Sequence, residues 1–145
     1  MTPDIRESTA DDADDVVHLL DAAMLEFDRE RVRRRVGEGD AIVAVDGKGN
    51  VVGACVLDTD TANRDQTEIE SIAVRRSRRG RGIGRALVDA AAMRAAGPLV
   101  ARFRGQVRPF YAALGFEIRR IGGEEREGDS DAGTDAGDRL CGILR

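Results

Sequence analysis

The sequence is poor in the residue types on which several functions depend. It contains one lysine, one histidine and no tryptophan, and aromatic residues make up only 3% of its 145 residues. So few rings leave little on which nucleic-acid bases could stack, and a net charge of −4 provides no basic field. We therefore expect no nucleic-acid partner. The lone histidine, His18, is expected to be a surface or packing residue.

Paired cysteines and long apolar runs are also missing. Cys55 and Cys141 lie far apart in apolar segments, without the Cys-x-x-Cys spacing or neighbouring histidine that metal or redox sites use. No run reaches about 18 apolar residues, and the first residues do not combine a basic with an apolar stretch. We expect buried free thiols, no metal, no membrane contact and a cytoplasmic protein.

The composition does not divide the chain. At 145 residues it has the length of one ordinary domain, and no proline-rich or serine-rich linker interrupts it. We expect a single domain over residues 1–145. Basic residues are almost all arginine and acids are mostly aspartate, a bias that fits either a high-salt cytoplasm or a GC-rich genome.

Apolar periodicity predicts a mixed α/β chain. Short apolar or alternating runs between turn residues indicate strands, and apolar residues recurring every three or four positions indicate helices. Strands are expected over residues 4–8, 41–45, 51–57, 66–74, 99–103, 116–121 and 138–144. Helices are expected from about residues 9, 29, 84 and 107, the first capped by Ser8 or Thr9. The acidic, glycine-rich residues 122–137 are expected to form a mobile loop.

A glycine-rich loop lies between the fourth expected strand and the helix after it, with the sequence Arg79-Gly80-Arg81-Gly82-Ile83-Gly84-Arg85. Glycines let the backbone lie against a ligand, and free N–H groups at a helix N-terminus favour phosphate. A Walker loop would need a lysine here, but the lysine is Lys48. A dinucleotide fingerprint would need glycine or alanine where Arg85 or Leu87 stands.

Two motifs carry a family resemblance. Arg79-x-x-Gly82-x-Gly84 resembles the acyl-CoA pyrophosphate loop of the GCN5-related N-acetyltransferase (GNAT) superfamily, and Phe110-Tyr111-Ala112-Ala113-Leu114-Gly115-Phe116-Glu117 resembles its second signature. With the elements between them they cover about residues 66–121. The resemblance implies a single-domain fold with a mixed, largely antiparallel sheet of six to seven strands and about four helices. It also implies acetyl-CoA as acyl donor.

The resemblance further assigns roles to individual residues. The pantetheine arm would pair with the backbone of one strand, and the pyrophosphate would lie on the glycine loop. These cofactor-binding residues are Ile72, Ala73, Val74, Arg79, Gly80, Arg81, Gly82, Ile83, Gly84 and Arg85. Tyr111, the only tyrosine, would be the general acid that protonates the departing thiolate.

A base is also needed, because an acceptor amine is mostly protonated at neutral pH. Strict alternation along residues 66–74 puts Glu68, Glu70, Ile72 and Val74 on one face, so either glutamate is a candidate base, directly or through a water. We favour Glu70 slightly, since it lies nearer the expected thioester. Pairing with arginine or exposure to solvent is the alternative for each.

The expected activity is transfer of an acetyl group to a primary amine, of a small molecule or a peptide N-terminus, by direct attack in a ternary complex. The alternative is a non-catalytic acyl-CoA-binding or regulatory module. Arg104 and Val107 stand where many relatives have asparagine and alanine, so carrier contacts there are expected to be weaker unless Arg104 replaces the asparagine. Four arginines before the loop fit the 3′-phosphate of CoA, a solvated turn or an RNA contact: Arg75, Arg76, Arg78 and Arg79. The acceptor and the oligomeric state, a homodimer included, stay open.

Overall fold

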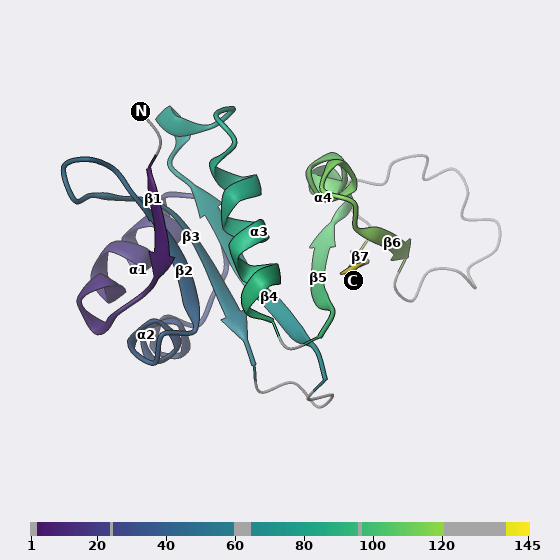
Figure 1. The fold of residues 1–145 in the computed structure, drawn as a ribbon, viewed down its shortest axis with the longest axis horizontal. Helices are drawn as coiled ribbons and strands as arrows, with labels where there is room; N and C mark the ends of the chain where they lie inside the picture. The colour runs from purple at the N-terminus through teal and green to yellow at the C-terminus, as the bar shows by residue number, and fades with distance from the viewer. Residues whose placement is uncertain (1–2, 24, 60–64, 96, 121–138) are drawn as a thin grey trace.

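The computed structural model describes residues 3–23, 25–59, 65–95, 97–120 and 139–145, which form one sheet and the helices around it (Figure 1). The strands are β1 Asp4–Glu7, β2 Ala41–Val45, β3 Val51–Asp58, β4 Thr67–Val74, β5 Leu99–Arg104, β6 Glu117–Arg120 and β7 Arg139–Leu144. The helices are α1 Ala13–Ala22, α2 Arg29–Gly37, α3 Ile83–Arg94 and α4 Arg108–Ala113. The expected order of elements is confirmed, and the expected loop over residues 122–137 lies outside the described residues.

The seven strands form one sheet in the order β1-β2-β3-β4-β5-β7-β6. Every neighbouring pair is antiparallel except β4 and β5, so the expectation of a mixed, largely antiparallel sheet is confirmed. The parallel pairing is short, running only from Thr67 opposite Leu99 to Ile69 opposite Ala101. Beyond that point β5 pairs with β7 alone, so among the described residues the last five residues of β4 have an open edge on this side.

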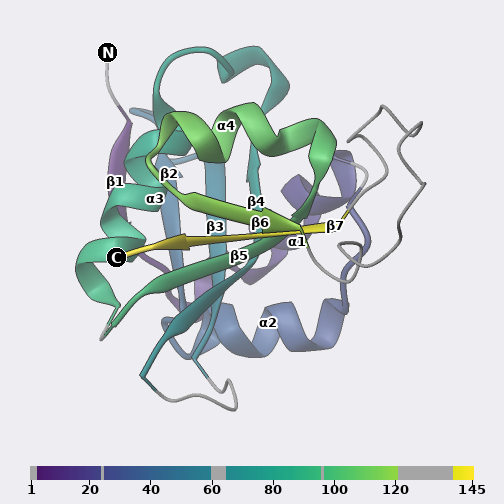
Figure 2. The same cartoon turned by 90° about the vertical axis from the view of Figure 1, so that its right-hand side faces the viewer.

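Helices cover both faces of the sheet. Helix α3 lies across one face, and α1 and α2 lie against the other (Figures 1 and 2). Each face has its own apolar core. Side chains of α3 pack with Cys55, Leu57 and Phe103, and those of α1 and α2 pack with Val43 and Val56. Burial of these aliphatic stripes is the main term that holds the helices on the sheet.

Strand β4 contains a bulge, which makes the expected strict alternation wrong. Ser71 lies opposite Val56 and Ile69 lies opposite Leu57, so Glu70 is an extra residue without a partner in the ladder. One inserted residue reverses the faces beyond it. Ile72 and Val74 therefore pack in the same core as Ile69, on the α3 face, and not beside the glutamates.

The first helical segment begins where the sequence predicts. Thr9 and Asp12 form a reciprocal capping box, in which the Asp12 carboxylate accepts a 2.8 Å hydrogen bond from the Thr9 N–H. The same carboxylate accepts from two nitrogens of Arg6 at 2.8 and 3.1 Å. The Arg6 guanidinium is the largest cause that lowers the pKa of Asp12. Through this pair the capped turn is tied to the edge strand β1.

Candidate active site

The glycine loop leaves a row of backbone N–H groups unused. Gly82 caps α3 in the left-handed conformation, with φ of 82°, and the first intrahelical bond joins the Ala86 N–H to the Gly82 carbonyl at 3.0 Å. Among the described residues, none accepts a hydrogen bond from the N–H groups of residues 80–85. A Cβ built on Gly82 would meet nothing within 4 Å. Free N–H groups at a helix N-terminus, with open space before them, are suited to an anion.

Two residues of the loop also hold α3 against α4. A Cβ on Gly84 would come within 2.9 Å of the Phe110 ring, so the missing side chain allows close packing. The Arg85 side chain donates a 3.0 Å hydrogen bond to the carbonyl of Ala113 at the end of α4. The sequence suggested only ligand contacts for Gly84 and Arg85, and the structure adds this packing role.

The four arginines before the loop are divided among different partners. Arg79 donates to the Val74 carbonyl at 3.2 Å, and Arg75 donates to the Val51 carbonyl at 3.4 Å. Arg78 instead pairs with Asp46 in the turn between β2 and β3, at 3.2 Å. Arg76 has no such partner among the described residues. Arg78 is therefore engaged by the turn and Arg75 by the start of β3, while Arg79 is tied to the end of β4.

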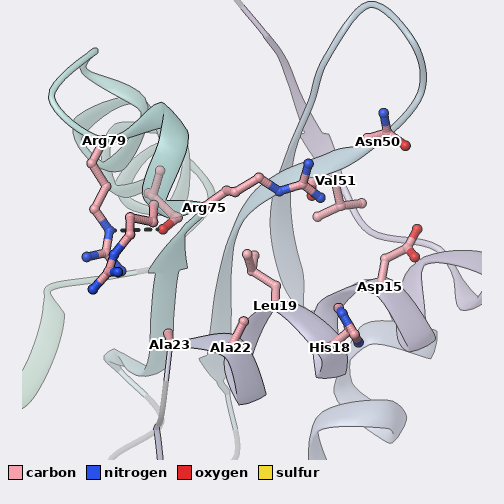
Figure 3. Close-up of a pocket in the computed structure, with 11 residues that line it drawn as sticks. Asp15, His18, Leu19, Ala22, Ala23, Asn50, Val51, Arg75 and Arg79 are labelled. Atoms are coloured by element: carbon pink, nitrogen blue, oxygen red, sulfur yellow. Dashed lines mark hydrogen bonds between the residues drawn. The ribbon is translucent and has the colours of Figure 1, made fainter.

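A cavity of about 600 Å³ opens beside this end of β4 (Figure 3). Arg75 and Arg79 reach into the region from one side, and Asp15 and His18 project from α1 on the other (Figure 3). Sequence reasoning did not foresee that α1 would line a cavity here. Asp15 and His18 lie three positions apart on one helix, which is a weak signal, and only the packing of α1 beneath β4 brings them to the arginines.

Tyr111 lies in the apolar core of the α3 face with 4% of its surface exposed. Its ring stacks on Phe103 at 4.2 Å between centroids and contacts Phe110 and Phe116 edge-on. Burial raises the pKa of Tyr111 above its ordinary value, because the phenolate would lose its solvation there. The phenol is therefore fully protonated at neutral pH. Among the described residues its hydroxyl has no hydrogen-bond partner.

Both glutamates of β4 are held by arginines. Glu70 accepts a 2.9 Å hydrogen bond from Nε of Arg35, a residue of α2 that is 4% exposed. Glu68 pairs with Arg102 of β5 at 2.7 Å. Glu68 lies opposite Asp58, which itself pairs with Arg35, so both glutamates face α2. The expectation that they share a face is confirmed, as is the arginine pairing considered for them.

The sequence profile of the acetyltransferase (GNAT) domain matches residues 37–118, more than half of the chain. The matched region holds the glycine loop, the bulged strand β4 and helix α4. This chain belongs to the GNAT acetyltransferase family. Among curated proteins, none matches this GNAT chain.

Solved structures share the fold over almost the whole chain. An acetyltransferase of the GNAT family from Bacillus cereus superposes with a TM-score of 0.78 at 17% identity, covering 100% of this chain and 98% of its own. Diaminobutyrate acetyltransferase EctA from Paenibacillus lautus, in complex with its substrate and coenzyme A, gives 0.70 at 16%, covering 98% and 95%. One chain of the NatC complex bound to Gag peptide and CoA gives 0.76 at 19%, covering 99% and 98%. At these identities the likeness shows the GNAT fold alone.

No described helix is long and apolar enough to cross a membrane. In the same part of the chain, no three side chains of histidine, cysteine, aspartate or glutamate gather as they would around a metal ion.

Proposed function

We propose that this protein transfers the acetyl group of acetyl-CoA to a primary amine by direct attack within a ternary complex. The amine nitrogen forms a bond to the thioester carbon, the carbon–sulfur bond breaks, and the thiolate takes up a proton. The proposal rests above all on the gap between β4 and β5, which begins beyond Ile69 and Ala101 and leads to the free amides at the start of α3. A strand edge that continues into an anion cradle suits a long, thin carrier ending in phosphates.

Acetyl-CoA would be held by backbone and by charge. Its pyrophosphate would accept hydrogen bonds from the N–H groups of residues 80–85, and its pantetheine arm would run along Ile72, Ala73 and Val74. The arm would supply one extra row of hydrogen bonds to an unpaired edge, as a peptide does when it joins a sheet. Arg79, Arg75 and Arg76 would supply positive charge for phosphate.

Tyr111 would act as the general acid toward the departing thiolate. Its raised pKa keeps the proton in place at neutral pH, so the phenol can donate a hydrogen bond as charge develops on sulfur. Complete transfer of the proton to a thiolate is uphill, since even an unperturbed phenol has a pKa of about 10 against about 8.5 for a thiol. The role is therefore chiefly stabilisation of the thiolate by a hydrogen bond.

Glu70 would take the proton from the amine, with Glu68 as the second candidate. Both ion pairs of Glu70 use Oε1, and among the described residues Oε2 has no partner. Glu68 likewise pairs through Oε1. Each carboxylate thus keeps a free oxygen for an amine or for a water that relays the proton.

Thiol release and acetyl-CoA binding together test this function. The wild-type protein should bind acetyl-CoA by calorimetry and release thiol with some member of a panel of primary amines. Tyr111→Phe keeps the stacked ring but removes the hydroxyl, so turnover should fall about 100-fold or more while the dissociation constant for acetyl-CoA changes little. Intact turnover in Tyr111→Phe would show that the acid assignment is wrong. Binding without thiol release for any amine would favour the non-catalytic alternative.

A further inference from the structure

The side of β4 that faces α2 carries a compact set of opposite charges. Three carboxylates and three guanidiniums alternate there, joined by ion pairs between Asp58 and Arg35, Glu70 and Arg35, Glu70 and Arg31, and Glu68 and Arg102. Their formal charges cancel. This set of side chains therefore offers both signs of charge within the reach of one small molecule.

Arg35 is not available to a ligand. Its side chain is 5% exposed and lies between Asp58 at 3.2 Å and Glu70 at 2.9 Å. Two carboxylates compensate for the burial of this single charge, so Arg35 fixes α2 to the bulge of β4. Arg102 is bound closely as well, since a hydrogen bond with Glu68 at 2.7 Å raises the pKa of Arg102.

Arg31 is different, because it lies one helical turn before Arg35 on the same side of α2 and is only loosely held. Its nearest acidic oxygen is Oε1 of Glu70 at 3.9 Å, which is beyond hydrogen-bond length, and its side chain is 47% exposed. Among the described residues no acceptor takes a hydrogen bond from its guanidinium. A guanidinium with unused donors is suited to a planar carboxylate, which it can bind through two parallel hydrogen bonds.

We infer that the acceptor amine also carries a carboxylate, as a free amino acid does, and that Arg31 binds that carboxylate while Glu70 receives the amine. The inference rests on the proposed acetyl transfer and adds the substrate class and a specificity residue. The free Oε2 of Glu70 and the donors of Arg31 lie around one carboxylate of the protein, so they present an acceptor and a donor side by side. A zwitterion matches both groups, whereas a polyamine offers no acceptor to Arg31 and a peptide N-terminus offers only a neutral carbonyl oxygen in place of a carboxylate.

Matched acceptors test this inference directly. Initial rates of thiol release are measured for the common amino acids, for their amides and for the amines that lack the carboxylate, at equal concentrations of unprotonated amine. Spermidine and a short peptide complete the panel. Some free amino acid should have a kcat/KM roughly tenfold or more above that of its amide and its decarboxylated amine, the effect expected for a charged hydrogen bond.

Variants of Arg31 then show whether this residue binds the carboxylate of the acceptor. Arg31→Gln should raise the KM for the amino acid roughly tenfold, leave the KM for acetyl-CoA unchanged, and have little effect on the poorer amide. Arg31→Lys should recover part of the loss, since it keeps the charge. Arg33→Gln is the matched control, because Arg33 lies on the same helix with the same 47% exposure but pairs with Asp14. It should behave as the wild type.

Several outcomes would overturn the inference while leaving acetyl transfer intact. These are an amide, a peptide or spermidine that reacts as fast as the best amino acid, or an unchanged preference in Arg31→Gln. If acetyl-CoA binds but no amine of any class releases thiol, acetyl transfer itself is wrong and the inference fails with it. The two failures are therefore distinguishable.

Discussion

At the scale of single residues, the two glutamates of β4 differ in what they hold. Glu70 compensates for the buried Arg35, whereas Glu68 pairs with Arg102, which is 47% exposed. Removing one member of a buried pair leaves the other charge poorly compensated, while a more exposed pair contributes little. The sequence placed both residues on one strand, but their different surroundings come from α2 and β5.

Replacement of each glutamate by glutamine should separate structure from catalysis. Glu70→Gln should lower the free energy of unfolding by about 1–3 kcal/mol, and Glu68→Gln by less than about 1 kcal/mol, as measured by urea denaturation. If Glu70 is the base, its glutamine variant should also lose the larger share of kcat, measured where both variants are fully folded. A larger kcat loss in Glu68→Gln would identify Glu68 as the base. A near-normal kcat in both variants would show that neither carboxylate is the base.

At the scale of elements, the loop before α3 is the feature that the sequence described most completely. The free amides of residues 80–85 and the left-handed Gly82 follow from local rules, since a glycine before a helix determines both its cap and its unused N–H groups. What the sequence could not show is the opening of the sheet next to the loop, because that depends on where β5 leaves β4.

Substitution of Gly82 tests the cradle against a matched position. Gly82→Val should raise the dissociation constant for CoA at least about tenfold, because the new side chain projects into the open space before the amides and is strained at φ of 82°. Gly49→Val carries the same strain, with φ of 86° and equally open surroundings, but lies in the β2–β3 turn. Calorimetry should show normal CoA binding in Gly49→Val. Equal losses of CoA affinity in both variants would indicate that strain alone is the cause. Unchanged CoA affinity in Gly82→Val would contradict the proposal that this loop binds the pyrophosphate.

At the scale of the whole molecule, a thiol and a phenol buried in the α3-face core predict that the protein becomes less stable at high pH. Burial raises the pKa of the Cys55 thiol to about 12, from about 9, and also raises that of Tyr111. Both groups ionise more easily in the unfolded chain, so their contribution is complete below about pH 9 and is lost as pH rises. The free energy of unfolding should fall by about 1 kcal/mol per pH unit above about pH 9, and more steeply above about pH 10 once Tyr111 contributes.

Urea denaturation of the wild type and of Cys55→Ala between pH 7 and 11 measures this effect. The variant should lose the decline that begins near pH 9 and keep only the decline above about pH 10 that belongs to Tyr111. A wild-type profile that stays flat up to pH 11, or an unchanged decline in Cys55→Ala, would contradict the assignment to these two groups.

The sequence by itself determined the elements, their order, the glycine loop before α3 and the family. These depend on turn residues, apolar periodicity and motif spacing, which act over a few neighbouring positions. Strict alternation failed at Glu70 because a bulge is set by the partner strand, which no local pattern reports. Only the tertiary structure decided which faces Ile72 and Val74 occupy, that Arg35 binds Glu70 across 35 positions, that α1 lines the cavity, and where β4 and β5 separate. All four depend on how segments that are distant in the chain pack against one another around the sheet.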